Sequence, residues 1–132
     1  MIVSPSEVVA AIQRAGGSSV PDSYFLCTAQ RESGFDTDAI DDGGTSIGIY
    51  QSRSGSFDLD AATVDMIALT ERNRLELRAA AGVSGADPWD MGAYLSVAHN
   101  QGLGAALQTI AEYGMDWEAY AARNGEVIKP GF

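Results

Sequence analysis

The side chain best placed for proton transfer is a glutamate at the end of a helix-like stretch. Glu32 closes an apolar run that begins near Tyr24, and Ser33 and Gly34 follow it as a helix stop. The C-terminal end of a helix carries partial negative charge, and apolar neighbours add a desolvation cost to a carboxylate. Both effects favour the neutral acid, which can donate its proton to the leaving oxygen of a glycosidic bond. Alone the pattern carries little weight, because most glutamates in a last helical turn are simply solvated.

A second group of polar and flexible residues follows in the stretch Ser46-Ile47-Gly48-Ile49-Tyr50-Gln51. A glycine such as Gly48 allows another chain or a sugar to approach the backbone closely. Gln51 offers donor and acceptor groups that suit hydroxyls and acetamides, and Tyr50 could stack on a sugar face. The alternative is an ordinary small hairpin with Tyr50 in the core.

A third polar group ends a later helix, in the stretch Ala98-His99-Asn100-Gln101-Gly102. The amide of Asn100 could hold a carbonyl group or the acid itself. The alternative is that Asn100 and Gly102 form a routine helix C-cap. Each of the last two stretches, taken alone, favours the structural alternative.

Together, the three motifs resemble the ordered signature of the superfamily of soluble lytic transglycosylases and goose-type lysozymes, over roughly residues 20 to 113. In that family an E-S motif ends a central helix, an S-x-G-x-x-Q motif lies on a small hairpin across a cleft, and an A-Y-N-A-G motif closes a later helix. Three short motifs in the same order and spacing are stronger evidence than any one of them.

The resemblance implies a mostly α-helical, lysozyme-like α+β domain with a small hairpin or irregular lobe and a substrate cleft, spanning residues 1–132 as a single domain. Glu32 would be the single catalytic acid, which later acts as a base. The substrate would be the glycan strand of peptidoglycan, cut between N-acetylmuramic acid and N-acetylglucosamine. The residues that the resemblance assigns to substrate binding or positioning are Ser33, Ser46, Gly48, Tyr50, Gln51, His99 and Asn100.

Two departures from the family pattern stand out. His99 occupies a position where the family has Tyr, and Gln101 one where it has a small residue. We interpret His99 as a polar residue under the cleft floor rather than as a catalytic one. Residues 52–64 do not resemble the family's usual continuation, so subsite contacts from that loop are not implied.

The family divides by what attacks the sugar. Transglycosylases use the substrate's own 6-hydroxyl group and need one carboxyl group, whereas goose-type lysozymes use water that a second carboxylate activates. We favour turn formation as the role of each candidate for that second carboxylate, and therefore favour the transglycosylase, with the muramidase as the alternative. The candidates are Asp36, Asp38, Asp41, Asp42 and Asp58.

Composition limits the partners. The net charge of -10 opposes binding to nucleic acid and to anionic lipid. Cys27 and His99, the single cysteine and histidine, are too few for a tetrahedral zinc site, and no cofactor is implied. No segment is long and apolar enough for a membrane span. The start lacks the features of a signal peptide, which fits a phage product that is packaged with other virion proteins or released through a holin, and fits an excised domain equally well.

The elements that must position these motifs are mostly helices. A capping box at residues 4–7 begins the first helix and Gly16-Gly17 ends it. A second helix runs from near Pro21 to Ser33, and residues 35–58 are expected to be irregular with a short strand or hairpin. Further helices are expected over about 63–81, from Asp87-Pro88 to about 100, over 103–113 and after Asp116.

Overall fold

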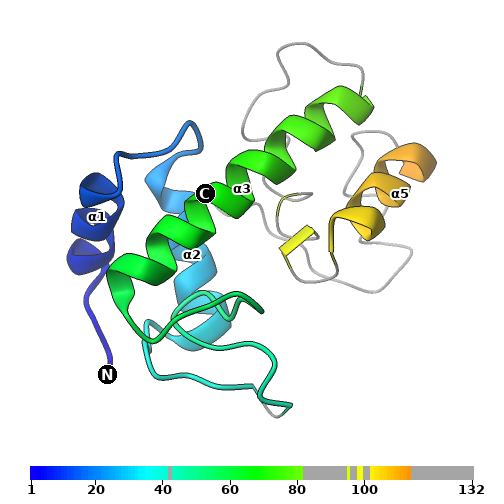
Figure 1. The fold of residues 1–132 in the computed structure, drawn as a ribbon. Coiled ribbons are helices and arrows are strands. Elements are labelled where there is room, and N and C mark those ends of the chain that lie inside the picture. The colour runs from blue at the N-terminus through cyan, green and yellow to red at the C-terminus, as the bar shows by residue number, and fades with distance from the viewer. Residues whose placement is uncertain (42, 82–94, 96–97, 100–101, 114–132) are drawn as a thin grey trace. The chain divides into compact units, whose positions relative to one another are not determined.

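The computed structural model of the chain describes residues 1–41, 43–81, 95, 98, 99 and 102–113. The chain divides into two compact units, Met1–Leu69 and Thr70–Gly131. One long helix, α3, contributes its first part to the first unit and its second part to the other (Figure 1). The single domain expected over residues 1–132 stays a prediction.

The first helix, α1, spans Pro5–Arg14 and begins at the expected capping box. The Ser4 hydroxyl accepts from the Glu7 amide at 3.2 Å, and the Glu7 carboxylate accepts from the Ser4 amide at 2.6 Å. These two bonds satisfy backbone donors that a helix start leaves without intrahelical partners. Gly16 and Gly17, both with positive φ, follow the helix and turn the chain.

The second helix, α2, spans Asp22–Ser33, as the sequence predicts. Its buried residues are Tyr24, Phe25, Thr28 and Ala29. The rings of Tyr24 and Phe25 meet edge to face, with their centroids 5.4 Å apart. Gly34 ends the helix in the left-handed conformation, at φ 62°. The core of the first unit thus surrounds the helix that carries Glu32.

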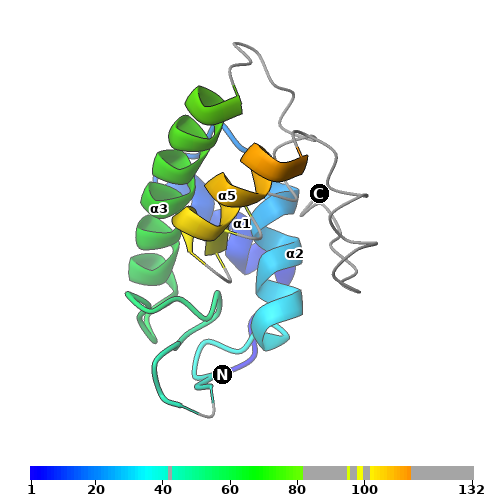
Figure 2. The same cartoon turned by 90° about the vertical axis from the view of Figure 1, so that its right-hand side faces the viewer.

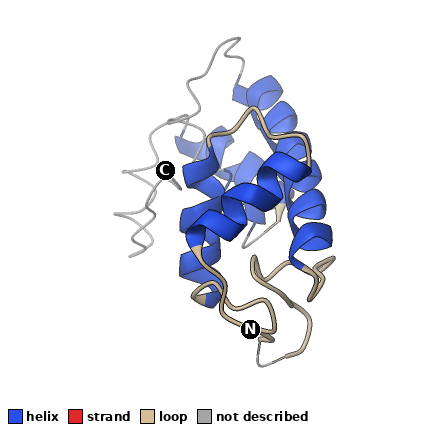
Figure 3. Cartoon of the chain, turned by 90° about the vertical axis from the view of Figure 1, so that its left-hand side faces the viewer, coloured by secondary structure: helices blue, strands red, loops and turns tan. Residues whose placement is uncertain are grey.

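Residues 34–41 and 43–58 form an irregular lobe, which lies below α2 in Figure 2 and is drawn as loop in Figure 3. The expected hairpin is reduced to isolated antiparallel bridges, which pair Ile47 with Ile40 and with Ser52. Because so few ladder bonds form, the backbone groups of this lobe depend on turns and side chains for their partners.

The third helix, α3, spans Leu59–Ala81 and begins before the start expected near Thr63. Asp58 is the reason: its carboxylate accepts from the Ala61 amide at 2.8 Å and its carbonyl from the Ala62 amide at 2.9 Å. In the second unit, α5 spans Leu103–Tyr113, as predicted.

The chain is mostly helical, which confirms the coarse fold class. Leu95, Ala98 and His99 are helical, while most of the helix expected from Pro88 and all of the one expected after Asp116 lie outside the described residues. Among the helices that the structure describes, none is both long and apolar enough to cross a membrane.

Tyr50 belongs to the core of the first unit. Its side chain is 1% exposed and its hydroxyl lies 3.0 Å from the hydroxyl of Thr63, which is itself fully buried. Burial raises the pKa of the Tyr50 phenol, and the bond to Thr63 opposes that rise only in part. The bond joins the irregular lobe to α3.

Replacing Tyr50 with Phe should lower the free energy of unfolding by about 1 kcal/mol at neutral pH, because one buried hydrogen bond is lost. Above pH 10.0, the ordinary pKa of a tyrosine phenol, the raised pKa of Tyr50 also affects the free energy of unfolding. The unfolded chain ionises while folded Tyr50 stays neutral, so this contribution is full below that value and is lost as pH rises through the raised pKa. Urea unfolding at neutral and strongly alkaline pH should show a smaller alkaline loss for Tyr50→Phe.

Thr63→Val provides the matched control, since it removes the other partner of the same bond. The double variant should lose less than the sum of the two single losses. Additive losses would show that the two hydroxyls do not interact.

Candidate functional site

Glu32 lies on the last turn of α2, at the border between core and solvent. Phe25 and Ala29, on the same side of the helix, are fully buried, whereas the Glu32 side chain is 20% exposed. The Nε atom of Arg31 donates to Oε1 of Glu32 at 3.2 Å. The carboxyl group is therefore partly accessible and has one adjacent cation.

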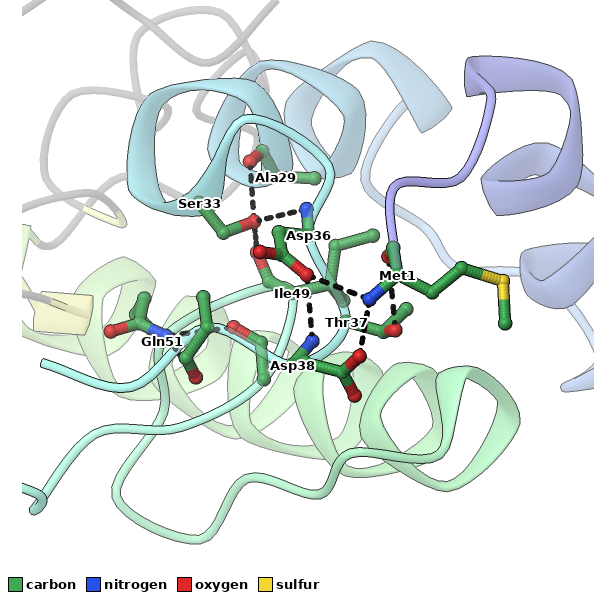
Figure 4. A network of polar contacts seen from close by, with 10 residues as sticks. Met1, Ala29, Ser33, Asp36, Thr37, Asp38, Ile49 and Gln51 are labelled. Atoms are coloured by element: carbon green, nitrogen blue, oxygen red, sulfur yellow. Dashed lines mark hydrogen bonds and ion pairs between the residues drawn. The ribbon is translucent and has the colours of Figure 1, made fainter.

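Ser33 joins the first motif to the second (Figure 4). Its Oγ atom lies 2.6 Å from the carbonyl oxygen of Ile49 and 3.0 Å from that of Ala29, so its single proton is shared between two acceptors. The same oxygen accepts from the Asp36 amide at 3.2 Å. Through one hydroxyl, the helix end that carries Glu32 is thus fixed to the middle of the second motif.

The backbone conformation and a neighbouring loop segment both require glycine at position 48. Its φ is +82°, and a Cβ atom built on it would lie 2.3 Å from the carbonyl oxygen of Ser56. The close approach expected at this glycine therefore comes from a neighbouring loop segment, which leaves no room for a sugar on that side. Gly48 thus shapes the lobe, and the subsite contact that the resemblance assigns to it stays a prediction.

Gln51 uses its amide nitrogen inside the lobe. Nε2 donates to the carbonyl oxygens of Ala39, at 3.0 Å, and Gly48, at 2.9 Å. Two acceptors on one side fix the orientation of the amide, and Figure 4 shows Oε1 pointing away from this network. The Nε2 atom, expected to donate to a sugar, therefore already donates to two backbone carbonyls. The Oε1 atom remains available as an acceptor.

Tyr50 differs from its expected role, whereas Ser46 has a backbone contact within the lobe. Because the Tyr50 ring is 1% exposed, the expectation that it stacks on a sugar is wrong, and the core alternative holds. The carbonyl oxygen of Ser46 accepts from the Asp41 amide at 3.0 Å, and the sugar contact expected of Ser46 stays a prediction. Residues of the second motif therefore have structural contacts within the lobe that their residue types alone do not predict.

Two of the candidate second carboxylates share the N-terminal ammonium group of Met1 (Figure 4). Asp36 accepts from that nitrogen at 2.9 Å and from the Asp38 amide, also at 2.9 Å. The amide and then the ammonium group lower the pKa of Asp36. Both carboxylates are thus held in a local ionic arrangement.

The remaining candidates also have local roles. Asp41 closes the turn at residues 41–46; burial opposes its ionisation, but bonds from Ser46 and Thr45 outweigh it and lower its pKa. Asp58 caps α3. Asp42 lies outside the described residues. The expected role in turn formation is confirmed for Asp41, whereas Asp58 has a different structural role as the cap of α3.

The third motif belongs to the second unit. Ala98 is buried, His99 is half-buried and helical, and the Gly102 amide donates to the Ala98 carbonyl at 3.0 Å. Asn100, assigned to substrate binding by the resemblance, lies outside the described residues, as does Gln101. Within one unit, the structure brings together the first two motifs.

Sequence reasoning missed two participants. Arg31 is the cation beside Glu32, and its position directly before the glutamate was the available signal. The Ile49 carbonyl is the partner of Ser33, and a backbone acceptor leaves no trace in residue types. Among the residues that the structure describes, no three His, Cys, Asp or Glu side chains gather as a metal site.

Replacing Gly48 with Ala should lower the free energy of unfolding by roughly 2–4 kcal/mol, because strain at positive φ adds to a backbone clash. Gly44→Ala is the matched control, since Gly44 also has positive φ, at +69°, but open space around its Cα. The control should lose only about 1 kcal/mol. Equal losses in urea unfolding would contradict the close approach of Ser56.

Replacing Ser33 with Ala should lower the free energy of unfolding by about 1–3 kcal/mol, because the buried Ile49 carbonyl loses its partner. Hydrogen exchange should become faster in residues 46–51 than elsewhere in the first unit. Ser23→Ala, on the same helix, should change neither quantity appreciably. Unchanged exchange in that segment would show that the Ser33 hydroxyl does not hold the lobe.

Comparisons with known proteins found no match to this chain among protein-family models, curated protein sequences or solved structures. The likeness to transglycosylases and goose-type lysozymes therefore rests on the three motifs. What the geometry adds is the direct bond between the first two of them, from Ser33 to Ile49.

Proposed function

We propose that this protein is a lytic transglycosylase that cleaves peptidoglycan glycan strands, with Glu32 as its acid and base. One observation carries the proposal: the Ser33 hydroxyl lies 2.6 Å from the Ile49 carbonyl, so the residue next to Glu32 is bonded to the middle of the S-x-G-x-x-Q stretch. Motifs that match only by chance have no reason to meet in space. Here a serine of the first contacts the second across sixteen positions of sequence.

The proposed fold is lysozyme-like, with a substrate cleft that has Glu32 on its floor. The mostly helical chain and the irregular lobe fixed to the end of α2 support this proposal. Gln51 fits a subsite role through its outward Oε1 atom, which can accept a hydrogen bond from a sugar hydroxyl or an acetamide N–H group.

The proposed reaction needs one carboxyl group. Protonated Glu32 gives its proton to the oxygen that joins C1 of N-acetylmuramic acid to O4 of N-acetylglucosamine, and the C1–O4 bond breaks. The resulting carboxylate then takes the proton of the muramic 6-hydroxyl, whose oxygen bonds to C1. The product is a 1,6-anhydro sugar, and Glu32 regains its proton.

The roles of the aspartates favour this reaction over hydrolysis. Activating water requires a carboxylate with accepting positions open toward the sugar. Asp36 and Asp38 accept from the Met1 ammonium group, Asp41 accepts from its own turn, and Asp58 accepts from the start of α3. Each described candidate thus has a local structural role, and the proposal therefore keeps the reaction that needs one carboxyl group.

Glu32→Gln should reduce the clearing of purified cell walls by at least about 100-fold, because the amide cannot donate a proton as an acid does. Glu76→Gln, an exposed glutamate on α3, is the matched control and should clear walls at the original rate. The measurement is loss of turbidity at equal protein concentration, after both variants have been shown to fold. Lysis that survives in Glu32→Gln would exclude this residue as the acid.

Mass spectrometry of the digested walls separates the two chemistries. The proposal expects muropeptides that are lighter by one water than the reducing sugars. Reducing ends alone would mean that water attacks and that the protein is a muramidase.

A further inference from the structure

Arg31 presents an open guanidinium edge beside Glu32. Its side chain is 36% exposed, and its Nε atom is the one that contacts Oε1 of Glu32. Within the described part of the chain, the terminal nitrogens Nη1 and Nη2 of Arg31 have no hydrogen-bond partner. Two nitrogens with N–H donors therefore remain available for a further partner next to the Glu32 carboxyl group.

Arg14, in the same unit, has a guanidinium that a carboxylate holds through two of its nitrogens. Its Nε and Nη2 atoms both contact the carboxylate of Asp60, and Nη2 lies 2.7 Å from Oδ1. This paired arrangement uses the edge that matches a carboxylate in shape. Arg31 holds its own partner through Nε alone, at 3.2 Å.

We propose that the Nη edge of Arg31 binds a carboxylate of the substrate, next to the bond that Glu32 cleaves. The inference rests on the proposed function and adds a specificity-determining residue to it. A planar guanidinium matches a carboxylate with two parallel bonds, which sets both affinity and orientation. Peptidoglycan offers such groups on each muramic residue: the lactyl carboxylate in glycan without peptides, and the carboxylates of the stem peptide in the intact wall.

The charge of the chain makes a local cation necessary. With 18 acidic residues against eight basic ones, the protein repels an approaching anion. Glu32 itself adds a negative charge at the site whenever it is ionised. An anionic substrate therefore needs a compensating group close to the cleavage point, and Arg31 is the basic residue that contacts Glu32.

The ion pair between Arg31 and Glu32 leaves the guanidinium able to change partner. Ion pairs between partly exposed side chains are weak, so a substrate carboxylate can replace Glu32 as the partner of Arg31 at little cost.

The test measures binding in the Glu32→Gln background, so that no substrate is cleaved. Calorimetry would use three ligands: an N-acetylglucosamine hexamer with no carboxylate, a peptide-free peptidoglycan hexasaccharide, and the same hexasaccharide with stem peptides. Each is measured with and without the added change Arg31→Gln. Arg14→Gln, which also removes one arginine from an ion pair, is the matched control for net charge.

Arg31→Gln should raise Kd about tenfold or more for the carboxylate-bearing ligands, as expected for loss of a charge-assisted pair, and less than about twofold for the uncharged hexamer. A loss confined to the peptide-free ligand identifies the lactyl carboxylate, and a loss confined to the peptide-bearing ligand identifies the stem. Arg14→Gln should change none of the three values by more than about twofold.

Two outcomes would overturn the inference, and they are distinguishable. If walls are cleaved in a Glu32-dependent way but Arg31→Gln affects all ligands equally or none, Arg31 does not bind a substrate carboxylate and the proposed function stands. If the protein neither binds nor cleaves any of the glycans, the proposed function fails and the inference fails with it.

Discussion

The hydrogen bond from the Ser33 hydroxyl to the Ile49 carbonyl is the interaction on which the rest of the site depends. Ile49 is fully buried, and its carbonyl sits in a lobe that has no regular ladder to satisfy it. A buried carbonyl without a partner costs more than an average hydrogen bond contributes, so the lobe has one strongly favoured position against α2. That position places the second motif beside the residue that follows Glu32.

The lobe achieves its shape by turning polar side chains inward. Gln51 bonds two backbone carbonyls, and Asp41 collects donors from its own turn. Gly48 admits the Ser56 backbone where any side chain would collide. The backbone groups of an irregular segment need hydrogen-bond partners that a regular sheet would otherwise supply. In this lobe, polar side chains of the types that often bind ligands supply some of those partners. Arg31, in contrast, lies in α2, where the helix itself supplies the backbone hydrogen bonds and the side chain is not needed for them.

Local signals in the sequence were enough to predict the helices of the first unit. The capping box at Ser4 and Glu7 and the glycine after Ser33 act within a few residues, so their consequences can be derived from spacing alone. The early start of α3 follows from the Asp58 cap, a signal of the same kind that the apolar pattern from Thr63 obscured.

The site was harder to predict, because its contacts join residues that are distant in sequence. Nothing near Tyr50 shows that its hydroxyl meets Thr63, and the same alternation of residues fits a ring that faces solvent or the core. The approach of Ser56 to Gly48 is likewise set by the path of a whole loop. Glu32 and Ser33 are candidates because a family pattern marks them, whereas the atoms that they contact follow only from the three-dimensional structure.

The end of α2 contains a feature whose effect reaches the acid. After Gly34, Phe35 also adopts a left-handed conformation, at φ 64°, which is costly for a residue with a bulky side chain. The turn is held from both sides, since the Phe35 amide bonds the Ala29 carbonyl and the Phe35 carbonyl accepts from the Val3 amide. A conformation that is unfavourable alone persists only where outside contacts hold it, so the bond from Val3 helps to keep Phe35 in this conformation. The backbone at the end of α2 therefore depends in part on the residues that precede α1, although the two segments are more than thirty positions apart in the sequence.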